Sequence, residues 1–139
     1  MSETEPTRST PTIVVGYIPN ALGRSAVLAA VAEARLRGAT VHVVNTSRGD
    51  AYVDHRLADP EQLTELERVL AGSGVPHQVV QHVARGEPAD EVLDAAREHS
   101  AVLIVIGLRR RTPVGKLLLG STAQRILLDA DCPVLAVKT

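Results

Sequence analysis

The residues with the clearest capacity for chemistry lie in one stretch, from Gly107 to Thr122, which reads GLRRRTPVGKLLLGST. Gly107 ends an apolar run, and Gly120 and Ser121 precede an apolar pattern with helical spacing. Backbone amides and hydroxyls at the start of a helix favour negative charge, because the helix dipole is positive there. A glycine also lets the backbone approach a ligand without a Cβ in the way. The stretch therefore predicts an anion site, with phosphate as the ligand class.

Cationic side chains within the same stretch strengthen this prediction. Arg109, Arg110 and Lys116 could supply charge-assisted hydrogen bonds to a phosphate. The alternative is an ordinary turn with solvated arginines, followed by a helix that begins with a Ser or Thr cap. Both interpretations stay open on these residues alone.

Two common phosphate-binding motifs are absent. A Walker A loop would need a glycine where Arg110 stands and a Ser or Thr where Leu117 follows Lys116. The first predicted turn between a strand and a helix reads GYIPNALG, and its glycine spacing differs from that of a dinucleotide-binding loop. Any phosphate site in this chain is therefore of a different kind.

The sequence predicts no catalytic residue and no metal site. Ser121 lacks the G-x-S-x-G pattern of a hydrolase nucleophile. The histidines show no metal-ligand spacing, and His77 and His82, five residues apart on one predicted strand, point to opposite faces. The full set is His42, His55, His77, His82 and His99. We expect a binding protein rather than an enzyme, with slow nucleotide hydrolysis as a further alternative that lacks a visible general base.

Composition limits the class of protein and its partners. The 139 residues fit one domain, and 45% of them are hydrophobic although Phe and Trp are missing. Val, Ile, Leu and Ala must then form the core, which suits a parallel sheet covered by helices. A net charge of −1 gives no field to attract nucleic acid or a membrane. One cysteine, Cys132, no signal sequence and no apolar run near 18 residues together predict a cytoplasmic protein.

The elements that must position the candidate site alternate along the chain. Residues 1–11 are a polar leader that we expect to be disordered, and residues 12–139 form the domain. Strands are predicted at 12–18, 40–46, 77–83, 101–107 and 132–138, and the most apolar, 101–107, is expected to be central. Helices are predicted at 22–37, after Asp59-Pro60 as far as Gly72 and Gly74, after Gly86-Glu87-Pro88, and at 121–130.

This alternation predicts an α/β fold, an open parallel sheet with helices on both faces. In such sheets, ligands bind beyond the carboxyl ends of the strands, where the strand order reverses. Residues 16–20, 45–48 and 107–121 should gather at that edge.

The chain resembles the universal stress protein family from position 12 to position 138. The family signature G-x2-G-x9-G-[ST] reads here as Gly107, Arg110, Gly120 and Ser121, with the spacing kept and arginine at the second glycine. The opening IVVGY, the GEP before the third helix and the closing DCPVLAVK are also similar to the family.

The resemblance implies an open twisted sheet of five parallel strands in the order 3-2-1-4-5, of the Rossmann-like, adenine nucleotide alpha hydrolase-like type. It also implies an adenine nucleotide: ATP first, with AMP or cyclic AMP as alternatives. The phosphates would lie on Gly107, Gly120, Ser121 and Thr122. Tyr17, Ile18 and Asn45 would lie beside the base and ribose, although the amide of Asn45 could equally cap a turn. Ile18 stands where the ATP-binding members carry Asp.

The last strand raises a separate hypothesis. As an edge strand, it would expose unpaired backbone groups that a second copy could cover across a two-fold axis. The resemblance implies the same homodimer, through Val134, Leu135, Ala136 and Val137. Two functions follow: a stress-response module that binds an adenine nucleotide, or a dimer without a nucleotide that acts through a protein partner. We expect the first, and the departures at Ile18 and Arg110 motivate the second as the alternative.

Overall fold

The computed structural model describes residues 10–47, 57–83, 87–108 and 119–138. Five strands form one parallel sheet in the order β3-β2-β1-β4-β5. They are β1 (Thr12–Tyr17), β2 (Thr40–Ser47), β3 (His77–Val83), β4 (Leu103–Leu108) and β5 (Val134–Lys138). The predicted fold class and strand order are confirmed.

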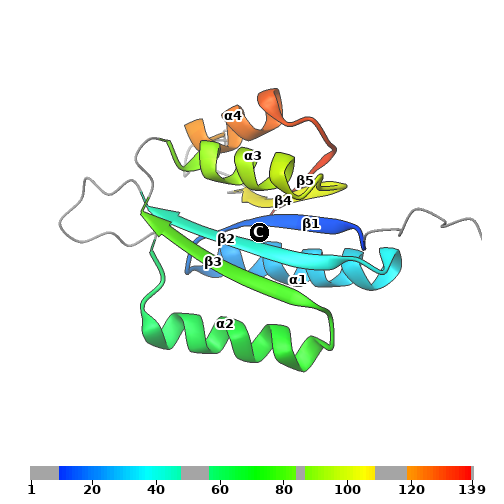
Figure 1. The fold of residues 1–139 in the computed structure, drawn as a ribbon. Helices are drawn as coiled ribbons and strands as arrows, with labels where there is room; N and C mark the ends of the chain where they lie inside the picture. Colours follow the sequence, from blue (N-terminus) through cyan, green and yellow to red (C-terminus); the bar gives the residue numbers. More distant parts are fainter. Residues whose placement is uncertain (1–9, 48–56, 84–86, 109–118, 139) are drawn as a thin grey trace, which may run out of the picture.

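Four helices cover the sheet on both faces: α1 (Ala21–Arg37), α2 (Pro60–Ser73), α3 (Pro88–Glu98) and α4 (Ser121–Asp129). Helices α1 and α2 lie on one face, and α3 and α4 lie on the other (Figure 1). Two clusters of small aliphatic side chains fill the layers. Ile13, Val15 and Val43 belong to the cluster on the α1 side, and Val14 and Ile104 belong to the cluster on the α3 side.

The helix boundaries follow the predicted capping chemistry with small differences. Helix α2 begins in a capping box, in which the Asp59 carboxylate accepts from the Gln62 amide at 2.8 Å. It ends at Gly74, whose φ of 74° lies in the left-handed region, and Gly72 lies inside the helix. Gly38, with a φ of 63°, ends α1 in the same way.

The strand positions refine the prediction in one respect. β1 is the middle strand, and β4 lies between β1 and β5, so the most apolar strand is interior without being the middle one. Strand β4 is buried on both faces, because α1 packs on one face and the hydrophobic cluster on the α3 side packs on the other. β3, with its mixed polarity, is at the edge. The strand order reverses between β1 and β4, and at that point a crevice is expected at the carboxyl edge.

No helix in the described ranges is both long enough and apolar enough to cross a bilayer.

Candidate functional site

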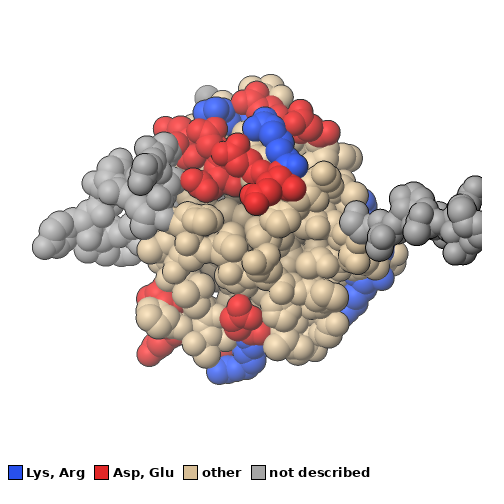
Figure 2. Space-filling model, viewed as in Figure 1, with Lys and Arg blue, Asp and Glu red and all other residues tan. Residues whose placement is uncertain are grey.

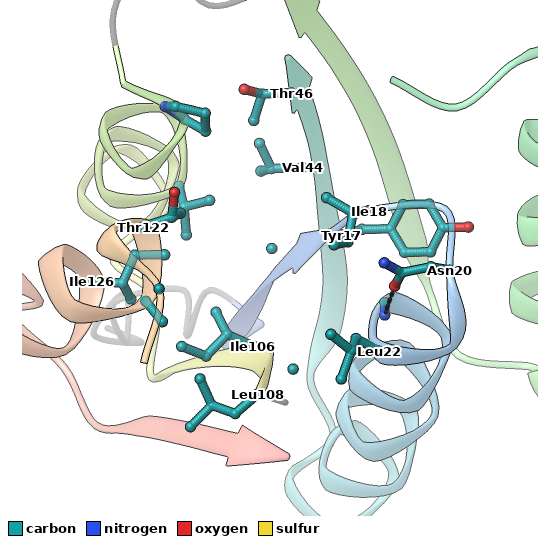
Figure 3. A pocket seen from close by; sticks show the side chains of 17 residues that line it. Tyr17, Ile18, Asn20, Leu22, Val44, Thr46, Ile106, Leu108, Thr122 and Ile126 are labelled. Carbon is teal, nitrogen blue, oxygen red and sulfur yellow. Dashed lines mark hydrogen bonds between the residues drawn. The ribbon is translucent and has the colours of Figure 1, made fainter. Parts of the chain in front are cut away.

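A cavity of about 340 Å³ opens at the carboxyl edge of the sheet, where β1 and β4 part. Gly16 and Tyr17 of β1 lie on one side of it, and Ile106 and Gly107 of β4 lie on the other. The first turn of α1, the carboxyl end of β2 and the amino ends of α3 and α4 complete the wall (Figure 3). The cavity is thus at the predicted switch point.

Most of the wall is apolar. Ile18, Val44, Ile106, Leu108 and Ile126 contribute branched side chains from four different parts of the fold (Figure 3). Polar groups are few and lie toward the helix starts and the end of β2. An apolar slot with a few convergent polar groups is typical of a small-molecule site.

The amino end of α4 supplies the polar side of the cavity. Gly120 is the N-cap residue, and its carbonyl accepts from the Gln124 amide at 2.9 Å. Within the described ranges, no acceptor pairs with the first amides of α4, those of Ser121 and Thr122. The hydroxyl oxygen of Thr122 is buried in the cavity wall, also without a hydrogen-bond partner. Buried polar atoms are nearly always paired in native structures, so this group is available to a ligand.

The four helices differ in how their amino ends are satisfied. The Asn20 side chain accepts from the Gly23 amide of α1 at 3.1 Å, and Asp59 does the same for α2. The N-cap of α3, Glu87, makes no side-chain capping hydrogen bond, and neither does Gly120 in α4. Asn20, Pro88 and Gly120 all line the cavity, so three helices begin beside it, and α3 and α4 are the two of these without a side-chain cap. Their dipoles favour an anion there.

Two glycines in the wall are required by backbone contacts. A Cβ on Gly107 would lie 2.6 Å from the Leu22 carbonyl oxygen, because the first turn of α1 packs directly on the end of β4. A Cβ on Gly23 would overlap the Ile18 carbonyl oxygen. Gly120 is different, because nothing lies within 4 Å of its would-be Cβ and its φ is −65°. Gly107 is therefore explained by the fold, whereas Gly120 is not.

Asn45 is fully buried and holds other parts of the protein together. Its Nδ2 donates to the Tyr17 carbonyl at 3.0 Å, and its Oδ1 accepts from the Ala58 amide at 2.8 Å and from Gln81 Nε2 at 3.0 Å. It is not among the residues that line the cavity. These contacts favour the structural alternative for Asn45 over a contact with a base.

The other predicted site residues divide into three groups. Tyr17, Ile18, Gly107, Gly120 and Thr122 line the cavity. Ser121 begins α4 but is exposed and does not line it. The cationic residues Arg109, Arg110 and Lys116 lie outside the described residues.

Tyr17 turns part of its side chain away from the cavity. It packs against the cluster on the α1 side of the sheet. Burial raises the pKa of its phenol, and the nearby Arg24 partly offsets this. Its side chain is thus shared between core and cavity.

The sequence did not identify several wall residues, notably Val44, Thr46 and Val92. Val44 and Thr46 lie two apart on β2 and share a face with His42, as strand alternation requires. The alternation along β2 could have identified Val44 and Thr46 as wall residues, because the carboxyl end of this strand was already expected at the site. Among the described residues, no three potential metal ligands lie together.

The outer surface on the α3 side is acidic. Figure 2 shows acidic side chains gathered over α3 and α4. Arg125 of α4 donates to Asp90 of α3 at 2.7 Å and to Asp129 at 3.0 Å. The Arg125–Asp90 pair links α4 to α3, the Arg125–Asp129 pair lies within α4, and each exposed pair adds little stability by itself.

Comparisons with known proteins agree with this geometry. The model of the universal stress protein family matches residues 10–138. A universal stress protein of Mycolicibacterium smegmatis is 48% identical over 126 residues, which cover 91% of this chain and 96% of that protein. The structure of a universal stress protein from Archaeoglobus fulgidus is similar with a TM-score of 0.72 and 31% identity, covering 94% of this chain and 99% of that one. A structure of the universal stress protein from the same organism in complex with dAMP has a TM-score of 0.64 and 26% identity, with 94% and 98% covered.

The contrast between the two signature glycines gives a stability test. Gly107→Ala should lower the free energy of unfolding by about 1–3 kcal/mol, because its Cβ must displace the backbone of Leu22. Gly120→Ala should change it by no more than about 0.5 kcal/mol. Urea denaturation of both variants measures the difference. Equal losses would show that the α1–β4 contact is looser than described.

Asn45→Ala should destabilise the protein by about 2 kcal/mol or more, because it leaves the Ala58 amide and the Tyr17 carbonyl without their partner. Thermal unfolding measures the loss, with Thr64→Ala on the exposed face of α2 as a control expected to stay near wild type. An Asn45→Ala protein of normal stability that had lost nucleotide binding would instead support a role for Asn45 at the base.

Proposed function

The chain belongs to the universal stress protein family, and on that premise we propose that it binds an adenine nucleotide in the cavity between β1 and β4. The relative solved in complex with dAMP supports the ligand class.

The observation that carries the proposal is the polar group at the start of α4. The buried Thr122 hydroxyl and the amides of Ser121 and Thr122 lie in the first turn of α4, where the helix dipole favours negative charge. A phosphate offers acceptor oxygens to all of these donors at once. Hydrogen bonds to a charged acceptor are roughly twice as strong as those between neutral groups.

The apolar part of the cavity suits the base. Ile18, Val44 and Ile106 present flat hydrocarbon surface against which a purine could lie. Ile18 also removes the carboxylate expected at this position from the family resemblance, so the ribose loses a charged anchor. We therefore expect the phosphate contacts to contribute a large share of the affinity.

We propose ATP as the first candidate ligand, with AMP and cyclic AMP as alternatives. Arg109, Arg110 and Lys116 follow Leu108 in the chain, and Leu108 lines the cavity. Their charges would be matched to the negative charge on the phosphate of any of these ligands, which is greatest for ATP. We expect a cytoplasmic stress-response module that binds its ligand without turnover.

A second candidate function rests on β5. In the described sheet, β5 is the outermost strand, and Val134, Leu135, Ala136 and Val137 are half-buried. The Ile104 amide donates to the Pro133 carbonyl at 3.0 Å, and Ile104 is in register with Val134. In a parallel pair with this register, the N–H and C=O groups of Val134 and Ala136 point away from β4. We propose that a second copy of the chain pairs with this edge to form a homodimer. If the chain binds no nucleotide, this dimer would act through a protein partner.

Thr122→Val should weaken the binding of adenine nucleotides by about 10- to 100-fold, because it removes one hydrogen bond to a charged phosphate while keeping the side-chain shape. Calorimetric titration with ATP, AMP and cyclic AMP measures the effect. Thr64→Val on α2 is the matched control and should bind like wild type. If wild type binds and Thr122→Val binds equally well, the phosphate lies elsewhere. If wild type binds none of the three at millimolar concentration, the nucleotide proposal fails.

Ala136→Pro should convert the dimer to a monomer. Proline removes an amide that points away from β4, so the sheet of one copy keeps its hydrogen bonds while the edge ladder is interrupted. Light scattering should give twice the 14.8 kDa chain mass for wild type and a single chain mass for the variant. Wild type that is monomeric at micromolar concentration would exclude the β5 dimer.

A further inference from the structure

Two histidines from distant parts of the chain stack on each other at the opposite end of α3 from the cavity. The rings of His42 on β2 and His99 after α3 have centroids 4.3 Å apart and are tilted by 43°. His42 is 4% exposed, whereas His99 is exposed to solvent. The pair therefore joins a water-accessible imidazole to one buried on the sheet.

The turn that ends α3 fixes His99 over the sheet. The His99 amide donates to the Ala95 carbonyl at 3.0 Å, and the Ala101 amide donates to the Ala96 carbonyl at 2.8 Å. Ser100 between them has a φ of 48°, in the left-handed region that non-glycine residues seldom adopt. These hydrogen bonds and the left-handed residue define the conformation of the turn that carries His99.

The charged and polar groups around His42 come from two neighbouring elements. From β3, the Gln78 side chain and His82 lie near enough to affect the pKa of His42, and Gln78 is in register with it. From α3, Glu98 and His99 face it. On β1, the residue in register is the apolar Val14. The single carboxylate and two further imidazoles leave a second positive charge poorly compensated.

Burial lowers the pKa of His42, and His99 lowers it further, while Gln78 and Glu98 act in the opposite direction. The unfolded chain therefore takes up this proton at a higher pH than the folded one does. Folding stability from this group is then present above about pH 6.5 and is lost as the pH falls toward the lower folded value. Protonation of His42 at low pH therefore weakens its contact with the ring of His99.

Helix α3 connects this pair to the cavity. Pro88 and Val92, near its amino end, line the cavity, and Val92 packs beside Gly16 of β1. His99 follows its carboxyl end. The same 11-residue helix thus contacts the cavity at one end and the histidine pair at the other.

From these contacts we infer that the His42–His99 pair is an acid-sensitive latch that docks α3 on β2, and that its protonation weakens ligand binding in the cavity. The second half of this inference rests on the proposed nucleotide site, and the first half stands without it. Two positive charges at this separation repel, and the burial of His42 limits the screening of that repulsion by water.

Hydrogen exchange tests the latch directly. Between pH 7.5 and 5.5, after correction for intrinsic exchange, the protection of the last turn of α3 should fall about fivefold or more relative to α1. His99→Gln, an exposed substitution, should reduce that fall, because it removes the repulsion between the two rings and leaves only the part that burial of His42 causes. His77→Gln, whose ring contacts Val75 and Glu67 on another part of the fold, should behave like wild type. A fall that is the same in wild type and His99→Gln, or the same in α3 and α1, would overturn the latch.

Cyclic AMP tests the coupling, because its phosphodiester does not titrate in this range. Its affinity should fall about fivefold from pH 7.5 to 5.5 in wild type and by a smaller factor in His99→Gln. Equal falls in the two proteins would overturn the coupling. Absence of cyclic AMP binding at both pH values, with no binding of AMP or ATP, would contradict the proposed function, and the exchange experiment would then decide the latch alone.

Discussion

A buried hydroxyl with no partner is the feature on which the account of this protein depends. The Thr122 oxygen and the first amides of α4 together leave donors unpaired at one end of a cavity, within the part of the chain that the structure describes. An unsatisfied buried polar group costs about 1–3 kcal/mol. Helix α1, which also begins at the cavity, and helix α2 satisfy amides at their amino ends with the side chains of Asn20 and Asp59. The free-energy cost of unpaired polar groups thus falls at the start of α4, where a bound ligand would supply the missing partners.

Backbone packing keeps this place open. The Leu22 carbonyl rests against Gly107, and the Ile18 carbonyl rests against Gly23, so α1 is seated directly on the ends of β1 and β4. Glycine at both positions permits a contact that any side chain would prevent. The first turn of α1 lies on one side of the cavity, and α3 and α4, which Arg125 joins, lie on the other. Among the described residues, the cavity between the ends of β1 and β4 therefore has side chains along its walls and none across it.

Sequence patterns predicted the elements and the edge of the sheet where they converge, because periodicity, capping residues and the rule for parallel sheets are local or topological. The roles of Asn45 and Gly107 were not predictable, since each depends on a contact with a residue 13 to 85 positions away, such as Ala58 or Leu22. The stacking of His42 on His99 is a similar case, because it needs the placement of α3 across β2. The basic residues Arg109 and Arg110 lie outside the described residues, so their part in the site stays a prediction.

The central claim is that a nucleotide phosphate satisfies the start of α4. The most direct measurement is the change in the backbone amide resonances of ¹⁵N-labelled protein during titration with AMP. The account predicts large, saturable shifts at Ser121, Thr122 and Ala123, with smaller ones along the apolar wall. Saturable shifts confined to other elements, or no shifts at millimolar AMP, ATP and cyclic AMP, would contradict it.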